Sequence, residues 1–165
     1  MVDDDIRVRR VAPGDAPELE RFYAELSAES RALRFHGASR GIGHEQADRF
    51  AAADHRLRDG LVAVADGRIA GHLVLERVGD GVEELAVAVD DRVQHHGVGT
   101  LLLAAAVASA RLRHVRRLVA WVKAENVAMR HLLNASHHPL RLSWEGSVAR
   151  YELEVPVNLP GSAAA

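Results

Sequence analysis

A turn with two glycines joins an apolar strand-like run to an apolar helix-like run in the middle of the chain. The turn reads Gln94-His95-His96-Gly97-Val98-Gly99-Thr100. It follows a β-prone run over 84–89 and precedes a Leu- and Ala-rich run over 101–113. Free backbone N–H groups at a helix N-terminus attract anions, and glycine allows close approach. The turn therefore predicts a phosphate-binding loop, with an ordinary strand-to-helix turn as the alternative.

Two common nucleotide motifs do not fit this turn. A dinucleotide fingerprint needs a third glycine at position 102, where the chain has Leu102, and no Gly-Lys-Ser/Thr follows Gly99. The remaining pattern, Arg/Gln-x-x-Gly-x-Gly/Ala, resembles the pyrophosphate loop of the GNAT superfamily of N-acetyltransferases. That resemblance implies acetyl-coenzyme A as the bound phosphate ligand.

The segments on either side of the turn extend the resemblance. Val87-Ala88-Val89-Asp90 is similar to the family's Val-x-Val-Asp strand, whose amides pair with the pantetheine arm. Glu125-Asn126-Val127-Ala128-Met129 is similar to the family's entry into the next helix, where the asparagine usually contacts coenzyme A. The resemblance thus implies a cofactor-binding set of ten residues: Val87, Val89, Gln94, His95, His96, Gly97, Val98, Gly99, Thr100 and Asn126.

A further segment points to one branch of the family. Residues 26–35 read Leu-Ser-Ala-Glu-Ser-Arg-Ala-Leu-Arg-Phe. They resemble the Leu-Ser-Pro-Glu-Ser-Arg-x-Leu-Arg-Phe segment of bacterial GNAT domains that acetylate protein lysines. Together the matched segments cover most of 5–155.

Composition sets the outer bounds. The chain has 165 residues, of which 48% are hydrophobic, no cysteine and a formal net charge of −2. We expect a single domain over 1–158 and a flexible tail over 159–165. The weak net charge gives no general attraction for nucleic acid. The acidic N-terminus and the lack of a long apolar run argue against a signal peptide or a membrane span, so we expect a cytoplasmic protein.

Apolar periodicity and turn residues predict a mixed order of strands and helices. Strands are expected at 6–9, 61–65, 68–77, 83–89, 117–122, 140–144 and 148–155, and helices at 18–26, 27–35, 45–53 and 101–113. Asp66-Gly67 predicts a hairpin, and a helical crossover predicts that 117–122 lies parallel to 84–89. The expected fold is α+β (mixed α/β): a GNAT-like, mostly antiparallel central sheet flanked by helices, with one parallel junction. The resemblance places the acetyl-CoA cleft at that junction.

Acetyl transfer to an amine needs a proton acceptor, because an unperturbed lysine has a pKa of about 10.4. Glu84 is the candidate general base, because it starts the strand that carries the coenzyme. It lies ten residues before Gln94, the spacing at which related protein acetyltransferases place their base. Glu83 is the alternative, since a register slip of one residue exchanges the two faces of a strand.

Two other kinds of chemistry find less support. Many small-molecule acetyltransferases of the family carry a tyrosine acid after the asparagine, but 132–136 read Leu-Leu-Asn-Ala-Ser, with Ser136 only a weak substitute. Tyr23 and Tyr151 are expected to pack. The ten histidines include adjacent pairs but no metal-binding spacing, so no metal is expected. Both tryptophans are interpreted as core residues.

The sequence therefore predicts an acetyl-CoA-dependent N-acetyltransferase in which an amine attacks directly in a ternary complex. A protein lysine is the favoured acceptor, and a small-molecule amine is the alternative. A non-catalytic acyl-CoA-sensing module is the competitor from another class, and it would not need Glu84. A monomer and a homodimer both remain open.

Overall fold

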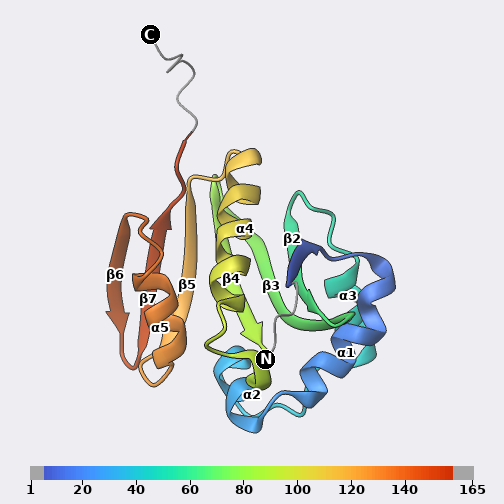
Figure 1. Ribbon diagram of the computed structural model, residues 1–165. Coiled ribbons are helices and arrows are strands. Elements are labelled where there is room, and N and C mark those ends of the chain that lie inside the picture. The colour runs from blue at the N-terminus through green and yellow to red at the C-terminus, as the bar shows by residue number, and fades with distance from the viewer. Residues whose placement is uncertain (1–5, 158–165) are drawn as a thin grey trace.

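The computed structural model describes residues 6–157, which form one sheet covered by helices (Figure 1). The expected tail over 159–165 lies outside the described residues. The strands are β1 Arg7–Arg10, β2 Arg58–Ala65, β3 Arg68–Gly79, β4 Val82–Val89, β5 Arg117–Lys123, β6 Leu140–Glu145 and β7 Val148–Glu154. The helices are α1 Ala16–Glu25, α2 Ala28–Phe35, α3 His44–Ala51, α4 Val98–Leu112 and α5 Val127–Asn134, with short 3-10 turns η1 Pro13–Asp15 and η2 Asp91–Val93.

The seven strands are ordered β1-β2-β3-β4-β5-β7-β6. Every neighbouring pair is antiparallel except β4 and β5, which run parallel. This order confirms the predicted α+β fold with one parallel junction. The β2–β3 hairpin closes through Asp66 and Gly67, both with positive φ (50° and 74°), as the Asp-Gly signal predicts.

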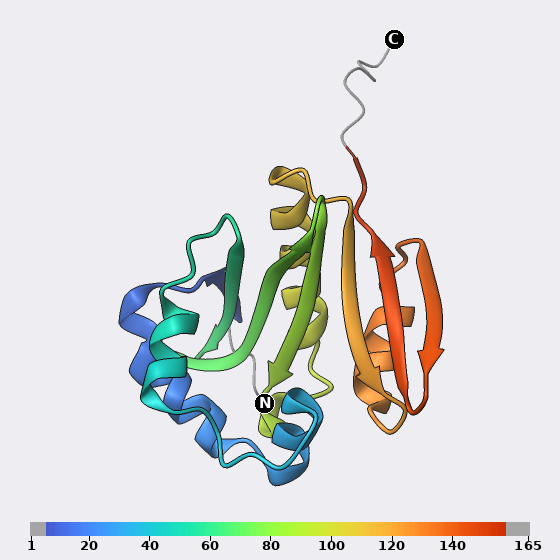
Figure 2. The same ribbon diagram turned by 180° about the vertical axis from the view of Figure 1, so that it is seen from behind.

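Helices cover the two faces of the sheet unequally. The core under α4 and α5 runs across the sheet from Leu61 on β2 to Leu153 on β7. The core under α1 and α3 reaches β2, β3 and β4, where Ala88 belongs to it, and includes no residue of β5, β6 or β7. Figure 2 shows α1 and α3 over the β1–β4 half from behind. The β5–β7 half therefore has a helical cover on one face only.

The parallel junction is short. β4 and β5 are paired only between Val82–Glu84 and Arg117–Val119, and beyond Glu84 the two strands separate. β4 stays paired with β3 along its whole length, up to Gly71↔Val89. One backbone edge of β4 is consequently left without a neighbouring strand over its second half.

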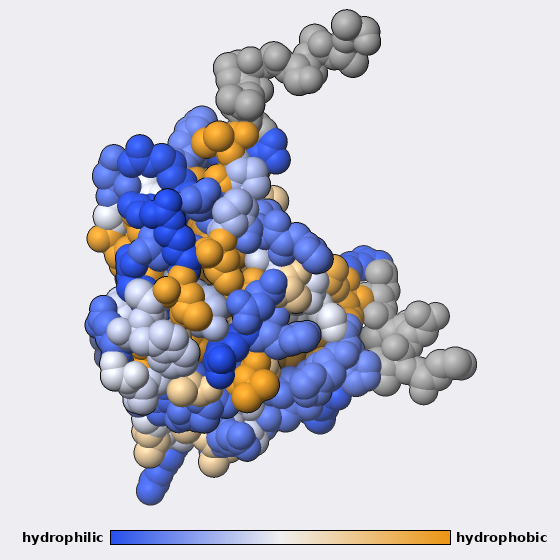
Figure 3. Space-filling model, turned by 90° about the vertical axis from the view of Figure 1, so that its left-hand side faces the viewer, coloured by the Kyte–Doolittle hydropathy of each residue, from blue (hydrophilic) through white to orange (hydrophobic). Residues whose placement is uncertain are grey.

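The structure corrects three details of the sequence prediction. Helix α4 begins at Val98, inside the glycine turn and three residues before the predicted start. Trp144, interpreted as core, is 48% exposed on β6, and Trp121 is only half-buried. Figure 3 views this β6 side and shows hydrophobic groups (orange) between hydrophilic ones (blue).

None of the helices within residues 6–157 combines the length and the apolar character that a membrane span requires.

Candidate active site

Two adjoining hollows lie where β4 and β5 separate. The larger has a volume of about 680 Å³ and is bordered by α2, the end of β4, the glycine turn and the start of α5. The smaller, of about 270 Å³, lies toward the start of β4 and the middle of β5. Both are lined by the same five residues at their junction: Leu33, Arg34, Val87, Asn126 and Met129. They therefore form one continuous cleft.

The glycine turn presents backbone donors at one end of the cleft. Gly97 is the N-cap of α4 with φ 82°, and no side chain caps the helix. His95 also has a positive φ, 65°. The N–H groups of the first helical turn have no partner within the helix, and α4, with no acidic residue in that turn, adds the positive end of its dipole. This end of the cleft can hold an anion such as a diphosphate.

β4 supplies further hydrogen-bonding groups along the cleft. The Asp90 N–H donates to the Ala70 carbonyl at 2.9 Å, which makes these two residues a hydrogen-bonded pair of β4 and β3. Because such pairs alternate along antiparallel strands, the N–H and C=O groups of Val87 and Val89 point away from β3. They face the side that β5 has left. An extended ligand can pair with them as a strand would.

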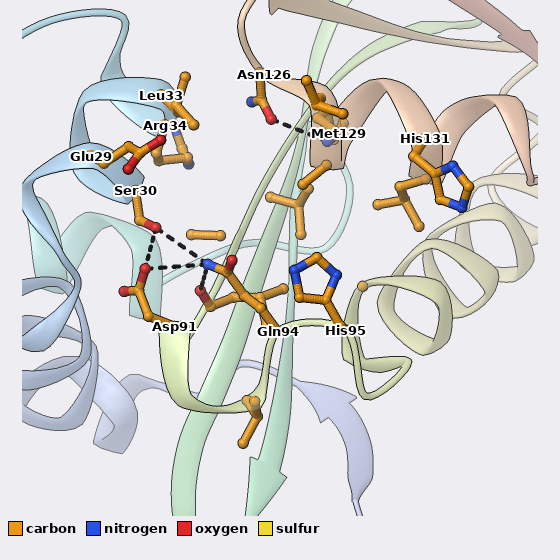
Figure 4. Close-up of a pocket in the computed structure, with 18 of the residues that line it drawn as sticks. Glu29, Ser30, Leu33, Arg34, Asp91, Gln94, His95, Asn126, Met129 and His131 are labelled. Carbon is orange, nitrogen blue, oxygen red and sulfur yellow. Dashed lines mark hydrogen bonds between the residues drawn. The ribbon is translucent and has the colours of Figure 1, made fainter.

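The N-terminus of α5 forms the opposite wall. Asn126 caps this helix, with its Oδ1 accepting from the Met129 N–H at 3.0 Å (Figure 4). The cap uses the side-chain carbonyl, and no described residue accepts a hydrogen bond from the Asn126 amide N–H groups. Asn126 lines both hollows, so its amide can donate to a ligand where they meet.

Helix α2 forms the third wall and is tied to the turn through Asp91. The Asp91 carboxylate accepts from the Ser27 N–H (2.8 Å), the Ser27 hydroxyl (2.8 Å) and the Ser30 hydroxyl (2.6 Å). Burial opposes the charge, but these hydrogen bonds hold the pKa of Asp91 below its usual value. Gln94 joins the cluster, donating to the Ser30 hydroxyl and the Val89 carbonyl at 3.2 Å each (Figure 4).

Eight of the ten predicted cofactor-binding residues line the larger hollow: Val87, Val89, Gln94, His95, Gly97, Gly99, Thr100 and Asn126. Val98 lies beneath the turn with its side chain in the core. The His96 ring lies against the Gln94 carbonyl at 2.9 Å rather than along the cleft. Only the backbone groups of Val98 and His96 are placed to contact a ligand.

The two candidate bases lie on opposite faces of β4. Glu84 is exposed, shares its face with Ala88 and lines the smaller hollow beside Trp121. No described residue forms a hydrogen bond or ion pair with its carboxylate. Glu83 faces the other way, is fully buried and forms a two-pronged ion pair with Arg113, one contact of which is 2.8 Å. The geometry favours Glu84 as the group that can meet a substrate.

Sequence reasoning missed Arg34, the only arginine or lysine in the described lining of either hollow. Its guanidinium lies over the rings of Phe35 and Phe50, 5.0 and 6.0 Å from their centres. Beneath it, the Tyr23 hydroxyl contacts the buried His72 Nδ1 at 2.9 Å. Burial, with a further contribution from Arg34, lowers the pKa of His72 to about 3, so the imidazole is neutral.

A tyrosine acid has no counterpart in this cleft. Tyr23 and Tyr151 are both at most 1% exposed, which fits the packing role expected of them. Neither they nor Ser136 line the two hollows as far as residues 6–157 are described. A thiol of pKa about 8.5 is a tolerable leaving group without an acid. Within the same residues, no group of three or more His, Cys, Asp or Glu side chains is arranged to hold a metal ion.

Comparison with known proteins agrees with this geometry. A model of the acetyltransferase (GNAT) family matches residues 19–137. The GNAT domain of S. lividans PAT is 30% identical, with 90% of each chain covered and a TM-score of 0.84. A GNAT-family acetyltransferase from Streptococcus pneumoniae is 22% identical, covering 92% of this chain and 100% of that one, with a TM-score of 0.75. YncA, a putative acetyltransferase of Salmonella typhimurium solved with acetyl-CoA, is 18% identical, covers 97% and 99%, and has a TM-score of 0.72.

The fold and the family match together define an acetyltransferase. The chain belongs to the GNAT family of acetyltransferases. It is therefore an N-acetyltransferase, a class of enzyme whose acetyl donor is acetyl-CoA.

Proposed function

We propose that the acetyl acceptor is the ε-amino group of a protein lysine and that Glu84 accepts its proton. The relative at 30% identity is the GNAT domain of a protein acetyltransferase. The segment over 26–35, which resembles protein-lysine acetyltransferases, forms the α2 wall of the cleft.

The observation that carries the proposal is the composition of the smaller hollow. Glu84 is the only carboxylate in its described lining. Leu33, Phe35, Ala86 and Trp121 line the same space. Arg34, His36 and Asn126 complete its polar lining. The apolar side chains suit the four methylenes of a lysine stem, and Glu84, which has no partner among the described residues, suits the ammonium at its end.

The donor would lie in the larger hollow. The N–H groups of the glycine turn would hold its diphosphate, and the outward groups of Val87 and Val89 would pair with the pantetheine arm. The Asn126 amide would donate where the two hollows meet. The thioester would then lie toward the smaller hollow.

The transfer is a direct displacement. The ammonium loses a proton to Glu84, and the neutral nitrogen attacks the thioester carbonyl. A C–N bond forms, the C–S bond breaks, and the thiolate of coenzyme A leaves. After attack the nitrogen releases its second proton. No tyrosine lies in the described lining, so the thiolate takes up either this second proton or one from solvent.

A panel of acceptors tests the proposal. Release of coenzyme A thiol is measured with lysine peptides, with the same peptides acetylated at lysine, and with free amino acids and other small amines. Turnover with unblocked peptides alone supports the protein-lysine assignment. Turnover with small amines alone would replace it, and tight acetyl-CoA binding without turnover on any acceptor would favour the sensing module.

Glu84→Gln tests the base in the same assay. General-base contributions are about 10²- to 10⁴-fold, so turnover at pH 7 should fall by that range while acetyl-CoA affinity is unchanged. The deficit should shrink as pH rises toward the pKa of the amine. Glu76→Gln is the matched control, because Glu76 lies directly opposite Glu84 on β3 and lines neither hollow. Equal turnover of both variants would remove Glu84 from the mechanism.

A further inference from the structure

Strand β6 is a regular edge strand without proline. It is the last strand of the sheet, and each of its residues after Leu140 is exposed. Leu142 and Trp144 are 49% and 48% exposed. Natural edge strands are usually shortened, bulged, covered, interrupted by proline or lined with charged side chains to prevent pairing with another chain, and of these devices β6 carries only the charges of Arg141 and Glu145. This edge is regular over six residues.

The hydrogen bonds to β7 identify the free backbone groups. The Glu154 N–H donates to the Pro139 carbonyl at 2.9 Å, and Leu140 lies opposite Leu153. By antiparallel alternation, Arg141, Ser143 and Glu145 bond to β7. The N–H and C=O groups of Leu140, Leu142 and Trp144 therefore point outward. A strand added to this edge must bond to those three residues.

The sequence of β6 is complementary to itself in one antiparallel register. When two copies pair about a two-fold axis at Ser143, Leu142 of each copy lies opposite Trp144 of the other, and these are outward-bonding residues. Arg141 of each copy then lies opposite Glu145 of the other. A register centred on Leu142 also satisfies the backbone but places Arg141 opposite Ser143. Only the first register matches opposite charges, and it does so twice.

The charged groups are available for this pairing. The Arg141 side chain is 78% exposed and lies 3.8 Å from Glu154. Glu145 is exposed and has no ion pair with any described residue. We propose that the protein forms a two-fold symmetric dimer by antiparallel pairing of its β6 strands, centred on Ser143. The two sheets become one, and both clefts stay open because β7 separates β6 from β5.

Exchanging the charges of Arg141 and Glu145 tests the pairing. The dimer is measured by sedimentation velocity over a range of concentrations. The contact is small compared with interfaces of about 1,200–2,000 Å², so a reversible dimer in the micromolar range is expected. Arg141→Glu and Glu145→Arg each place like charges opposite one another twice, and each should weaken the dimer at least tenfold. The double variant should restore it. Arg49→Glu, an exposed arginine on α3, is the control and should leave the dimer intact.

A cross-link tests the register. The chain has no cysteine, so Ser143→Cys introduces a single thiol. The two thiols would meet at the axis in a non-hydrogen-bonded pair, with Cα atoms about 4.5 Å apart, close enough for a disulfide. Mild oxidation should give a covalent dimer with Ser143→Cys and none with Arg141→Cys, two residues along the same face. A monomeric wild type at all concentrations, a double charge variant that stays monomeric, or equal cross-linking of both cysteine variants would overturn the proposal.

Discussion

The two halves of the sheet differ in how they are covered. β3, in the first half, is packed on both faces, and seven consecutive residues from Ile69 are buried. β7, in the second half, alternates buried and half-exposed residues. A strand with both faces covered reads as a continuous apolar run, whereas a one-sided strand alternates. The difference in cover between the two halves can therefore be seen in the sequences of the two strands.

The two halves contribute different parts of the cleft. The half covered on both faces, β1–β4, is called here the two-sided half, and β5–β7 the one-sided half. The two-sided half contains β4, whose backbone groups and following turn face the larger hollow, so its packed core holds the donor side of the cleft in position. The one-sided half contributes Trp121 to the smaller hollow and an open edge at β6. An acceptor that is itself a protein needs that open face. The cleft lies where the two halves separate.

Gly97→Glu tests the role of the two-sided half most severely. The new side chain would put a negative charge at the helix N-terminus and disturb donors aimed at the diphosphate. Loss of two charge-assisted hydrogen bonds corresponds to about 3 kcal/mol or more, so coenzyme A should bind at least about 100-fold more weakly by calorimetry. Gly67→Glu carries the same change at a similar φ of 74° in a remote hairpin. Unchanged affinity in a folded Gly97→Glu variant would refute the site.

Glu83→Gln and Glu84→Gln should separate stability from turnover on the same strand. Glu83 is fully buried against Arg113, whose side chain is 11% exposed, so Gln at 83 leaves this buried cation with only its second partner, Asp59, at 3.5 Å. The free energy of unfolding should fall by about 2–3 kcal/mol. Glu84→Gln, on the open face, should leave it within about 0.5 kcal/mol. Denaturant unfolding checks both. A stable Glu83→Gln variant with impaired turnover would mean that Glu83 is the base.

The sequence predicted most elements because local signals agreed with the packing. Asp66-Gly67 fixed a hairpin, and Ser27 caps α2 as predicted, accepting from the Ser30 N–H at 3.1 Å. Periodicity could not show how long the parallel junction is, because separation of β4 from β5 depends on what packs between them. It also could not place Arg34, whose position depends on rings from α2 and α3.

The histidines show a second limit of sequence reasoning. Six described residues other than glycine have positive φ, and five of them are histidine: His36, His55, His95, His114 and His137. Histidine is among the side chains that tolerate this conformation, so it occupies positions where glycine or asparagine is more usual. His137 shows this after the asparagine-capped helix α5, where it adopts φ 60°.

His72 makes the two-sided half sensitive to acid. Its pKa is about 3 in the folded protein and about 6.5 when unfolded, so below pH 6.5 only the unfolded chain takes up the proton. Stability should then fall by up to about 1.4 kcal/mol per pH unit, or about 2 kcal/mol by pH 5. His72→Leu should remove this part of the slope in denaturant titrations at pH 5–7.5. Tyr23→Phe keeps the imidazole and should retain it. Parallel slopes for wild type and His72→Leu would contradict buried, neutral His72.

The smallest effect should be the same in both halves, because it is local to the backbone. His114 follows α4 with φ 58°, its N–H bonded to the Arg111 carbonyl, and His137 follows α5 with φ 60°. The left-handed conformation costs an L-residue about 1–2 kcal/mol. Glycine avoids this cost, but it loses more chain entropy on folding, which offsets about 0.5–1 kcal/mol of the gain. His114→Gly and His137→Gly should each raise the free energy of unfolding by up to about 1 kcal/mol. His131→Gly, inside α5, should instead lower it by about 0.5 kcal/mol. If only one of the two left-handed positions gains stability, the two halves differ in how their helices end as well as in how they are packed.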